Sequence, residues 1–184
     1  MSSRKAHPDD GREADTGGGR SVLFLDFDEV IALGTHYGGH HLLQRPQPAD
    51  LHRHLWHPPA LAALLSVVAQ AKPTIVLTTT WLRFLDLASA RQLFQRTNAA
   101  LLAEQLHPFG EAPQTVGQTR LQSIDAWMKT NGQPKNYVIL DDAESGTGLI
   151  GSRHAAAGRL FLCELGHGFR PEQVPSVLEV LGVS

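Results

Sequence analysis

The sequence predicts an α/β protein with three layers, in which helices cover both faces of a mostly parallel central sheet. Short continuous apolar runs recur along the chain, as expected for strands that are buried on both faces. Stretches with a helical spacing of apolar residues separate these runs. Because strands that alternate with helices are typical of βαβ units, these two observations together predict a covered, mostly parallel sheet.

Four strands are expected, at residues 22–25, 74–78, 137–140 and 160–163. Helices are expected from Pro58 onward, over 81–105 with one break near 97–98, over 119–129, and from Pro171 toward the C-terminal end. Residues 33–57 do not fit this alternation, because they are long, rich in glycine and proline, and without a clear period. A segment of this kind predicts a loop or a minimal cap inserted into the domain.

The composition limits the class of protein. The chain has 184 residues, enough for one domain, and its 42% apolar content excludes disorder along the whole length. Sixteen basic side chains oppose eighteen acidic ones, for a formal net charge of -2. A general nucleic-acid binder would show a basic surplus, so we expect no strong general nucleic-acid binding, while local binding of one phosphate end stays open.

The predicted domain covers residues 21–184. Residues 1–20 combine charges of both signs with three consecutive glycines and no apolar period, which predicts a disordered tail. No segment reads as a signal peptide or reaches the about 20 apolar residues that cross a bilayer, so we expect a soluble, cytoplasmic protein. The single cysteine, Cys163, excludes an internal disulfide and is expected to be a buried thiol.

Two of the predicted strands end in paired carboxylates, Asp26 with Asp28 and Asp141 with Asp142. In an open α/β sheet the ligand crevice lies beyond the carboxyl ends of the strands, so these side chains are expected to face it. Carboxylate oxygens are the ligands that Mg²⁺ prefers, which predicts a magnesium site. In an Asp-x-Asp pair, one carboxylate can serve as nucleophile while the next exchanges protons.

Hydroxyl groups and a cation complete this pattern. The threonines 78–80 follow a third strand, where their hydroxyls can hold a phosphoryl oxygen without adding charge. Arg120 stands at the start of the helix expected over 119–129. An anion at that place would feel both the guanidinium group and the positive end of the helix. The order along the chain is therefore carboxylate pair, hydroxyls, cation and carboxylate pair.

At this point the sequence resembles the haloacid dehalogenase-like (HAD) superfamily of phosphohydrolases. The four motifs of that superfamily correspond to residues 25–28, 78–80, Arg120, and 141–142, and the likeness covers about 21–183. Residues 75–81 (IVLTTTW) and 137–142 (YVILDD) are similar to the small HAD domains associated with RNA-repair proteins. The resemblance implies a Rossmann-like HAD fold with a minimal cap and Mg²⁺-dependent phosphatase activity.

The resemblance also implies a role for each matching residue. Asp26 would attack phosphorus to form an aspartyl-phosphate, and Asp28 would protonate the leaving oxygen and later activate water. The phosphoryl group would be held by Thr79, which we prefer to Thr78, together with Thr80 and Arg120. The Mg²⁺ ligands would be Asp26, the main-chain carbonyl of Asp28, and Asp141 or Asp142. The expected substrate is a phosphorylated molecule: a nucleic-acid end, a nucleotide or a small metabolite.

Two residues depart from the pattern of the superfamily. Glu29 stands where glycine is usual, and it either tolerates an altered turn or adds a carboxylate near the metal. Arg120 stands where lysine is more common, and arginine presents a larger planar group. The alternatives to a phosphatase are therefore a catalytically inactive binding module that keeps the fold, and a phosphotransferase.

Two further signals compete with this interpretation. Residues 146–151 match G-x-G-x-x-G, the pattern of a dinucleotide-binding loop, but the first glycine does not directly follow the strand. We therefore interpret these residues as a loop at the edge of the crevice, where Ser145, Thr147 or Arg153 could touch substrate. The segment 33–57 is rich in histidine, which allows a second metal site or, as we prefer, a solvated loop that steers anions. The histidines are His36, His40, His41, His52, His54 and His57.

Overall fold

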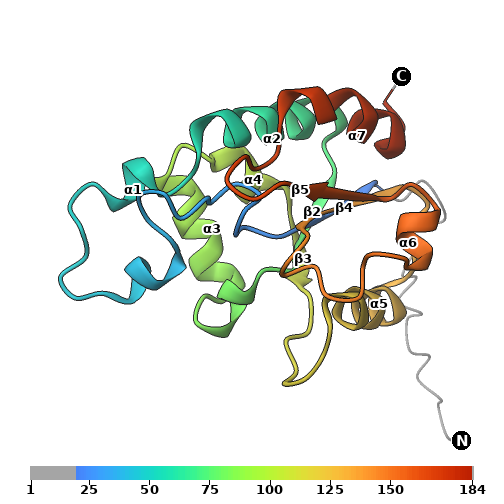
Figure 1. Cartoon of the computed structure of the whole chain (residues 1–184), viewed down its shortest axis with the longest axis horizontal. Coiled ribbons are helices and arrows are strands. Elements are labelled where there is room, and N and C mark those ends of the chain that lie inside the picture. The colour runs from blue at the N-terminus through green and yellow to red at the C-terminus, as the bar shows by residue number, and fades with distance from the viewer. Residues whose placement is uncertain (1–19, 184) are drawn as a thin grey trace, which may run out of the picture.

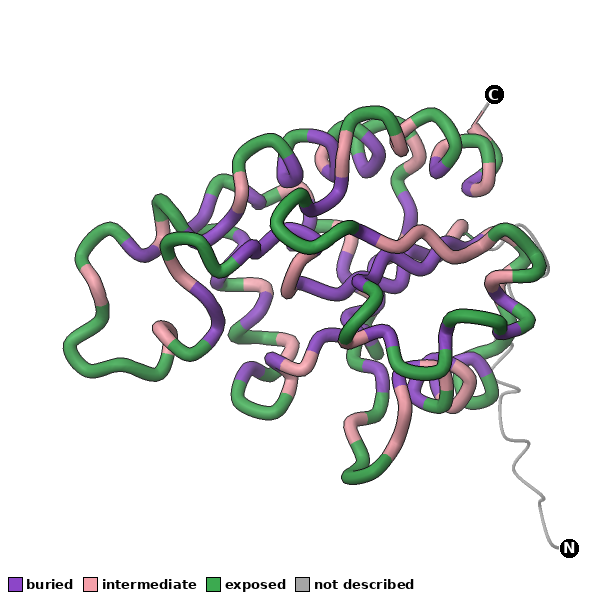
Figure 2. Tube along the Cα trace, in the orientation of Figure 1, coloured by how far each residue is buried: buried purple, intermediate pink, exposed green. Residues whose placement is uncertain are grey.

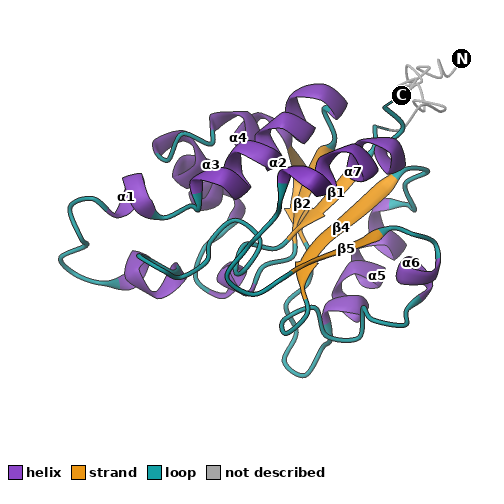
Figure 3. Cartoon of the chain, turned by 45° about the horizontal axis from the view of Figure 1, so that its top comes forward, coloured by secondary structure: helices purple, strands orange, loops and turns teal. Residues whose placement is uncertain are grey.

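The central sheet (Figure 1) has five strands, all parallel, in the order β3-β2-β1-β4-β5, and the neighbours β2, β1, β4 and β5 can be followed in Figure 3. The computed structural model describes residues 20–183, so the predicted tail lies outside the described residues except for Arg20. The strands are β1 (Val22–Leu25), β2 (Thr74–Leu77), β3 (Leu106–Glu111), β4 (Tyr137–Asp142) and β5 (Leu160–Cys163). The predicted α/β class and parallel sheet are confirmed.

Helices cover both faces of this sheet and form the outer two layers (Figure 3). One face carries α2 (Pro58–Ala71), α3 (Leu87–Arg96), α4 (Ala100–Gln105) and α7 (Val174–Leu181). The other face carries α5 (Arg120–Asn131) and α6 (Arg153–Ala156). No helix among residues 20–183 is long and apolar enough to cross a membrane.

Alternate residues of β1 supply both cores. Leu23 and Leu25 pack with the helices of the first face, whereas Val22 and Phe24 pack on the α5 side. The Phe24 ring meets Trp127 of α5 edge to face, with centroids 5.4 Å apart. Burying one such side chain stabilises the fold by roughly 1.5–3 kcal/mol, so β1, which is buried throughout, is a main contributor to stability (Figure 2).

One strand was not predicted, and one predicted helix is wrong in its extent. The expected helix over 81–105 is divided into the 3₁₀ helix η2 (Thr80–Arg83), α3 and α4. The break near 97–98 is confirmed, with Asn98 at a φ of 57°. A second break precedes α3, where the Asp86 side chain accepts the Ser89 N–H and caps the helix. Strand β3 lacks the continuous apolar run by which the other strands were predicted, because it is an edge strand that contains Pro108 and Gly110.

The segment 33–57 lies between β1 and α2 and contains two short helices, η1 (Gly39–Leu43) and α1 (Leu51–His54). Its first part projects away from the sheet, as the light-blue loop of Figure 1 shows. Its last part joins the core through Leu51, Leu55 and Trp56. Trp56 therefore belongs to the core of the domain. The buried position predicted for Cys163 is confirmed, and burial raises the pKa of its thiol to about 12.

Candidate active site

The carboxyl ends of three neighbouring strands bring the predicted site together. Leu25 of β1 pairs in register with Leu77 of β2 and Leu140 of β4, so the next residues, Asp26, Thr78 and Asp141, form one row. Backbone hydrogen bonds continue across this row, from the Thr78 N–H to the Leu25 carbonyl (2.9 Å) and from the Asp26 N–H to the Leu140 carbonyl (3.0 Å). All three side chains of the row are buried.

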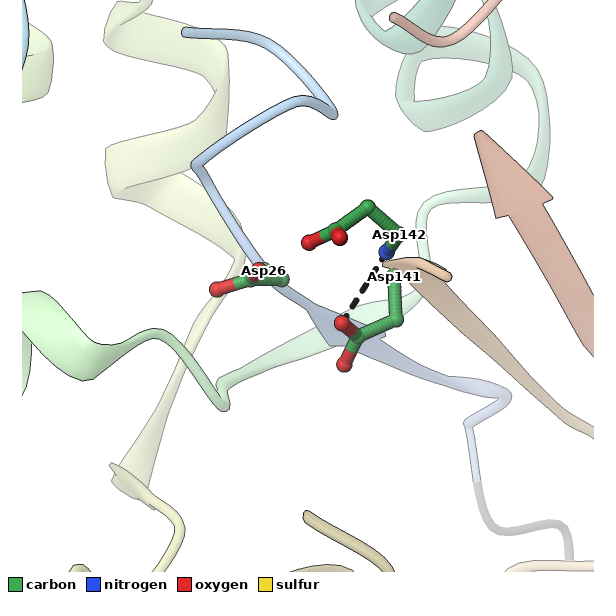
Figure 4. A group of neighbouring side chains, drawn as sticks. All are labelled: Asp26, Asp141 and Asp142. Carbon is green, nitrogen blue, oxygen red and sulfur yellow. Dashed lines mark hydrogen bonds between the residues drawn. The ribbon is translucent and has the colours of Figure 1, made fainter. Parts of the chain in front are cut away.

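Three carboxylates meet at this edge of the sheet, as Figure 4 shows. Asp26, Asp141 and Asp142 each offer one oxygen, and these oxygens lie within 4.8 Å of one another. None of the three side chains is more than 2% exposed. Burying ionised carboxylates is costly unless they are paired, so this cluster requires positive charge.

Arg120 supplies part of that charge from the first residue of α5. Its Nη2 lies 3.2 Å from Oδ1 of Asp26, and its Nε lies 2.8 Å from Oδ2 of Asp141. The helix begins here because the Thr119 hydroxyl accepts the Gln122 N–H in a capping box. The guanidinium group thus bridges the ends of β1 and β4, as the proposed order of motifs requires.

Ser145 joins the same cluster, a position that sequence reasoning had only suggested as one of three possible substrate contacts. Its Oγ lies 2.9 Å from Oδ2 of Asp26 and 3.2 Å from Oδ1 of Asp141, and it also bonds Oδ2 of Asp142. The other oxygen of Asp142 accepts the backbone N–H groups of Glu144 (2.7 Å) and Ser145 (2.9 Å). The turn after β4 is therefore folded around the carboxylates.

The glycine-rich loop at 146–151 holds two parts of the site in place, the turn after β4 and the start of α5. A Cβ atom added at Gly146 would lie 2.5 Å from the Asp142 carbonyl oxygen, so the close approach of the backbone requires glycine there. The Thr147 hydroxyl accepts the Arg120 N–H (2.9 Å) and so holds the start of α5. Arg153 lies elsewhere, in a largely exposed ion pair with Asp125.

The electrostatics of the cluster fit a divalent cation. Burial raises the pKa of the Asp26 carboxyl, and this effect outweighs the positive charge of Arg120, which lowers that pKa. Burial also raises the pKa of Asp141 to about 8, with the charge of Asp26 adding to the effect. Three carboxylates lie in this cluster against one guanidinium group, so Arg120 alone does not balance their negative charge when all three are ionised. A buried set of anionic oxygen donors that lacks positive charge is suited to a hard cation such as Mg²⁺.

Asp28 occupies the turn after β1 and is only half-buried. Its Oδ2 accepts the indole N–H of Trp81 at 2.8 Å. Burial raises the pKa of the Asp28 carboxyl to about 6, although the hydrogen bond from Trp81 acts in the opposite direction. A carboxyl with such a pKa can give and take a proton near neutral pH.

Of the two roles expected for Glu29, an altered turn or an added carboxylate near the metal, the structure shows the altered turn. Its φ is 56°, in the left-handed region that favours glycine. Its carboxylate accepts the backbone N–H of Gly166 at 2.6 Å. Within residues 20–183, the cluster with metal-ligand spacing consists of Asp26, Asp141 and Asp142, without Glu29. The side chain therefore ties the turn to the loop after β5.

The three threonines lie at the end of β2 in different surroundings. The Thr78 hydroxyl is buried and has no hydrogen-bond partner among the described residues. The Thr79 hydroxyl accepts the Trp81 N–H (3.3 Å) and caps η2, of which Thr80 is the first residue. The row in the sheet thus places Thr78 beside Asp26, whereas Thr79, preferred from the sequence, stands one residue further on.

The histidine-rich segment does not form a comparable cluster. Among residues 20–183, no three histidine, cysteine or acidic side chains other than the aspartate cluster have ligand atoms close enough to hold one metal. His36 and His54 stack with ring centroids 5.6 Å apart, and Tyr37 donates to Asp50 at 2.5 Å. These contacts stabilise the segment internally.

Comparison with known proteins identifies the family of this chain. The model of a family described as the HAD domain in Swiss Army Knife RNA repair proteins matches residues 22–174, from β1 to the first residue of α7. No curated protein and no solved structure gave a significant match. The matched range contains every residue of the candidate site, and the parallel sheet is that of a Rossmann-like HAD fold. The chain therefore belongs to the HAD domains of Swiss Army Knife RNA repair proteins, within a superfamily of hydrolases and phosphatases.

Proposed function

We propose that the protein is a Mg²⁺-dependent phosphatase that hydrolyses a phosphomonoester through an aspartyl-phosphate on Asp26. One observation supports this proposal: the buried Asp26 carboxylate pairs with the guanidinium group of Arg120 and forms one cluster with the carboxylates of Asp141 and Asp142. The carboxyl group of Asp28, two residues further on, is only half-buried and can therefore exchange protons with substrate and water.

In the first step, an oxygen of Asp26 attacks phosphorus while the bond between phosphorus and the ester oxygen breaks. Asp28 donates its proton to that oxygen, and the alcohol leaves. Arg120 and the hydroxyls of Thr79 and Thr80 stabilise the charge on the other phosphoryl oxygens. Mg²⁺, bound by Asp26, Asp141 or Asp142 and the main-chain carbonyl of Asp28, would offset the negative charges of nucleophile and phosphate.

In the second step, a water oxygen attacks phosphorus and the bond from phosphorus to Asp26 breaks. The Asp28 carboxylate takes the proton of that water, and inorganic phosphate leaves with the site restored. The same residue thus acts first as acid and then as base, which its pKa of about 6 favours near neutral pH.

The substrate classes in this proposal are a nucleic-acid end, a nucleotide and a small phosphorylated metabolite. The family description names RNA repair, which supports the first class. The test is phosphate release from a panel of oligonucleotides phosphorylated at the 5′ or 3′ end, nucleotides and sugar phosphates, with and without Mg²⁺. Mg²⁺ binding without release from any of them would indicate a binding module, and transfer to an added alcohol would indicate a phosphotransferase.

We expect Mg²⁺ to raise the melting temperature of the wild type in the absence of substrate, and to raise it much less in Asp142→Asn. At about 100 times the dissociation constant, a bound ligand stabilises the folded state by about 2.7 kcal/mol. For a domain of this size that corresponds to roughly 5–10 °C. Asp125→Asn is the matched control, because Asp125 bonds Arg153 and His154 outside the cluster. Equal Mg²⁺-induced shifts in both variants would exclude Asp142 as a ligand.

A further inference from the structure

The indole ring of Trp81 lies between the proposed acid and base, Asp28, and the segment 33–57. Its Nε1 donates to Oδ2 of Asp28 at 2.8 Å, and Trp81 itself is only 2% exposed. Within residues 20–183, this is the one side-chain hydrogen bond that the Asp28 carboxylate accepts. A single rigid donor therefore decides which way this carboxylate points.

The two aspartates of the first motif are held in different ways. Asp26 is buried, and both of its oxygens are engaged, one by Arg120 and the other by Ser145. Asp28 lies at the start of the turn after β1 and is half-buried, and among the described residues only Trp81 donates a side-chain hydrogen bond to its carboxylate. Because Trp81 engages Oδ2, Oδ1 is left for proton exchange with the leaving oxygen and with water. Proton transfer depends on such fixed geometry between donor and acceptor.

The indole is itself fixed by an aromatic cluster. Its ring lies edge to face with Phe27 at 5.2 Å and is stacked with Trp56 at 5.7 Å and with Phe84 at 6.2 Å between centroids. Its backbone N–H donates to the Thr79 hydroxyl. Since Phe27 lies between Asp26 and Asp28 in the chain, the cluster ties the indole to the same turn that carries both aspartates.

The segment 33–57 contacts the indole directly through Gly39, the first residue of η1. A Cβ atom added at Gly39 would lie 2.6 Å from Cε2 and 2.8 Å from Nε1 of Trp81. The added Cβ would also lie 2.9 Å from Cδ2, so the backbone of the segment lies over the face of the indole, next to the nitrogen that donates to Asp28. At the neighbouring Gly38, an added Cβ would meet only His40, at an ordinary 3.5 Å.

We propose that Trp81 is the positioning residue of Asp28, and that the close approach of Gly39 keeps the indole in place. The inference rests on the proposed function, in which Asp28 gives its proton to the leaving oxygen. The inference gives the segment 33–57 a role in the reaction, because its Gly39 holds the Trp81 indole and the indole in turn orients Asp28.

The test compares substrates that differ in their need for an acid. An alkyl phosphate such as glycerol 2-phosphate needs a proton on its leaving oxygen, whereas p-nitrophenyl phosphate releases a stable phenolate. We expect Trp81→Phe, which keeps a ring but loses the donor, to lower kcat/KM for the alkyl phosphate by about 10–100-fold. For the nitrophenyl ester the expected loss is about 3-fold or less.

Two matched controls separate positioning from packing. Trp127→Phe removes an indole donor on the other face of the sheet, bonded to the Phe109 carbonyl at 2.6 Å, and is expected to keep the wild-type ratio of the two kcat/KM values. Gly39→Ala is expected to change the ratio in the direction of Trp81→Phe, and Gly38→Ala is not. Equal losses on both substrates in Trp81→Phe, or a changed ratio in Trp127→Phe, would overturn the proposal, and an unchanged ratio in Gly39→Ala would remove Gly39 from it.

A spectroscopic measurement keeps the inference separate from the proposed function. The indole N–H signal of Trp81 in a ¹H–¹⁵N correlation spectrum, identified by its loss in Trp81→Phe, is expected to shift in Asp28→Ala. The signal of Trp127, which bonds the Phe109 carbonyl, is expected to stay in place. A wild type that hydrolyses no phosphomonoester would contradict the proposed function. An unmoved Trp81 signal would contradict the positioning contact whatever the activity.

Discussion

Asp26→Asn is expected to lower the rate of phosphate release by a factor on the order of 10⁴. An amide oxygen is a poor nucleophile, so the variant cannot form the aspartyl-phosphate. Asparagine has the shape of aspartate, and its oxygen can still accept the hydrogen bond of Ser145. Because burial raises the pKa of Asp26, the ionised carboxylate is disfavoured in the fold. We therefore expect the neutral variant to unfold at the same urea concentration as the wild type or a higher one.

The measurement is phosphate release from p-nitrophenyl phosphate in the presence of Mg²⁺, followed by mass spectrometry of acid-quenched enzyme. A peptide that contains Asp26 and carries one extra phosphoryl group is expected in the wild type and not in Asp26→Asn. Asp125→Asn, outside the cluster, serves as the control and is expected to keep the wild-type rate. Turnover by Asp26→Asn at the wild-type rate would remove Asp26 from its proposed role.

Arg120→Met is expected to lower the free energy of unfolding by roughly 3–5 kcal/mol above about pH 8 in metal-free buffer. The side chain of Arg120 is 4% exposed and lies against two carboxylates that are buried as well. Methionine fills a similar space without charge or donors, so Asp26 and Asp141 would be left unpaired. The same change is expected to abolish phosphate release, because Arg120 would no longer stabilise the transferring group.

The loss of stability in Arg120→Met is expected to become smaller toward about pH 5. Burial already raises the pKa of Asp141 to about 8 in the folded protein, above its value in the unfolded chain. Such a group stabilises the fold while it is protonated, and that contribution is lost as the pH rises through the folded pKa. Without Arg120, the pKa values of Asp26 and Asp141 would rise further. At low pH both carboxyls are therefore neutral and no longer need the guanidinium group.

Urea unfolding of wild type and Arg120→Met at both pH values measures this effect. Arg153→Met is the control, since its ion pair with Asp125 is 62% exposed on the arginine side and is expected to contribute less than about 1 kcal/mol. A deficit in Arg120→Met no larger than in Arg153→Met, or one that does not change with pH, would show that the buried pair does not hold the cluster together.

The main elements of the site could be predicted because their signals are local. Strands β1, β2 and β4 are apolar runs that end in polar residues, and the order of such runs along the chain indicates a parallel sheet. Polar side chains that follow these strands must lie at one edge, which brings Asp26, Thr78 and Asp141 into one row. Arg120 could be placed because the helical spacing of apolar residues over 119–129 puts it at the start of that helix, where the structure has a cap formed by Thr119 and Gln122.

Other features of the site depend on contacts between distant segments. The Ser145 hydroxyl reaches Asp26 across 119 positions of the chain, and Trp81 reaches Asp28 across 53. No periodicity or spacing records such contacts, because they depend on how the loops fold over the sheet edge. Strand β3 was missed for a related reason: it pairs only with β2 at the edge of the sheet and has few buried side chains.

By itself the sequence determined the class of fold, the edge of the sheet that carries the carboxylates, and the side chains available for chemistry there. It could do so because apolar runs, helix caps and strand ends are read within a few residues. Only the tertiary structure decided which oxygen of each carboxylate is engaged, how Glu29 turns the chain away from the cluster, and which part of the segment 33–57 lies against the indole of Trp81. These features depend on packing between segments that are far apart in the chain. Because the interior is close-packed, the position of each side chain depends on the side chains around it.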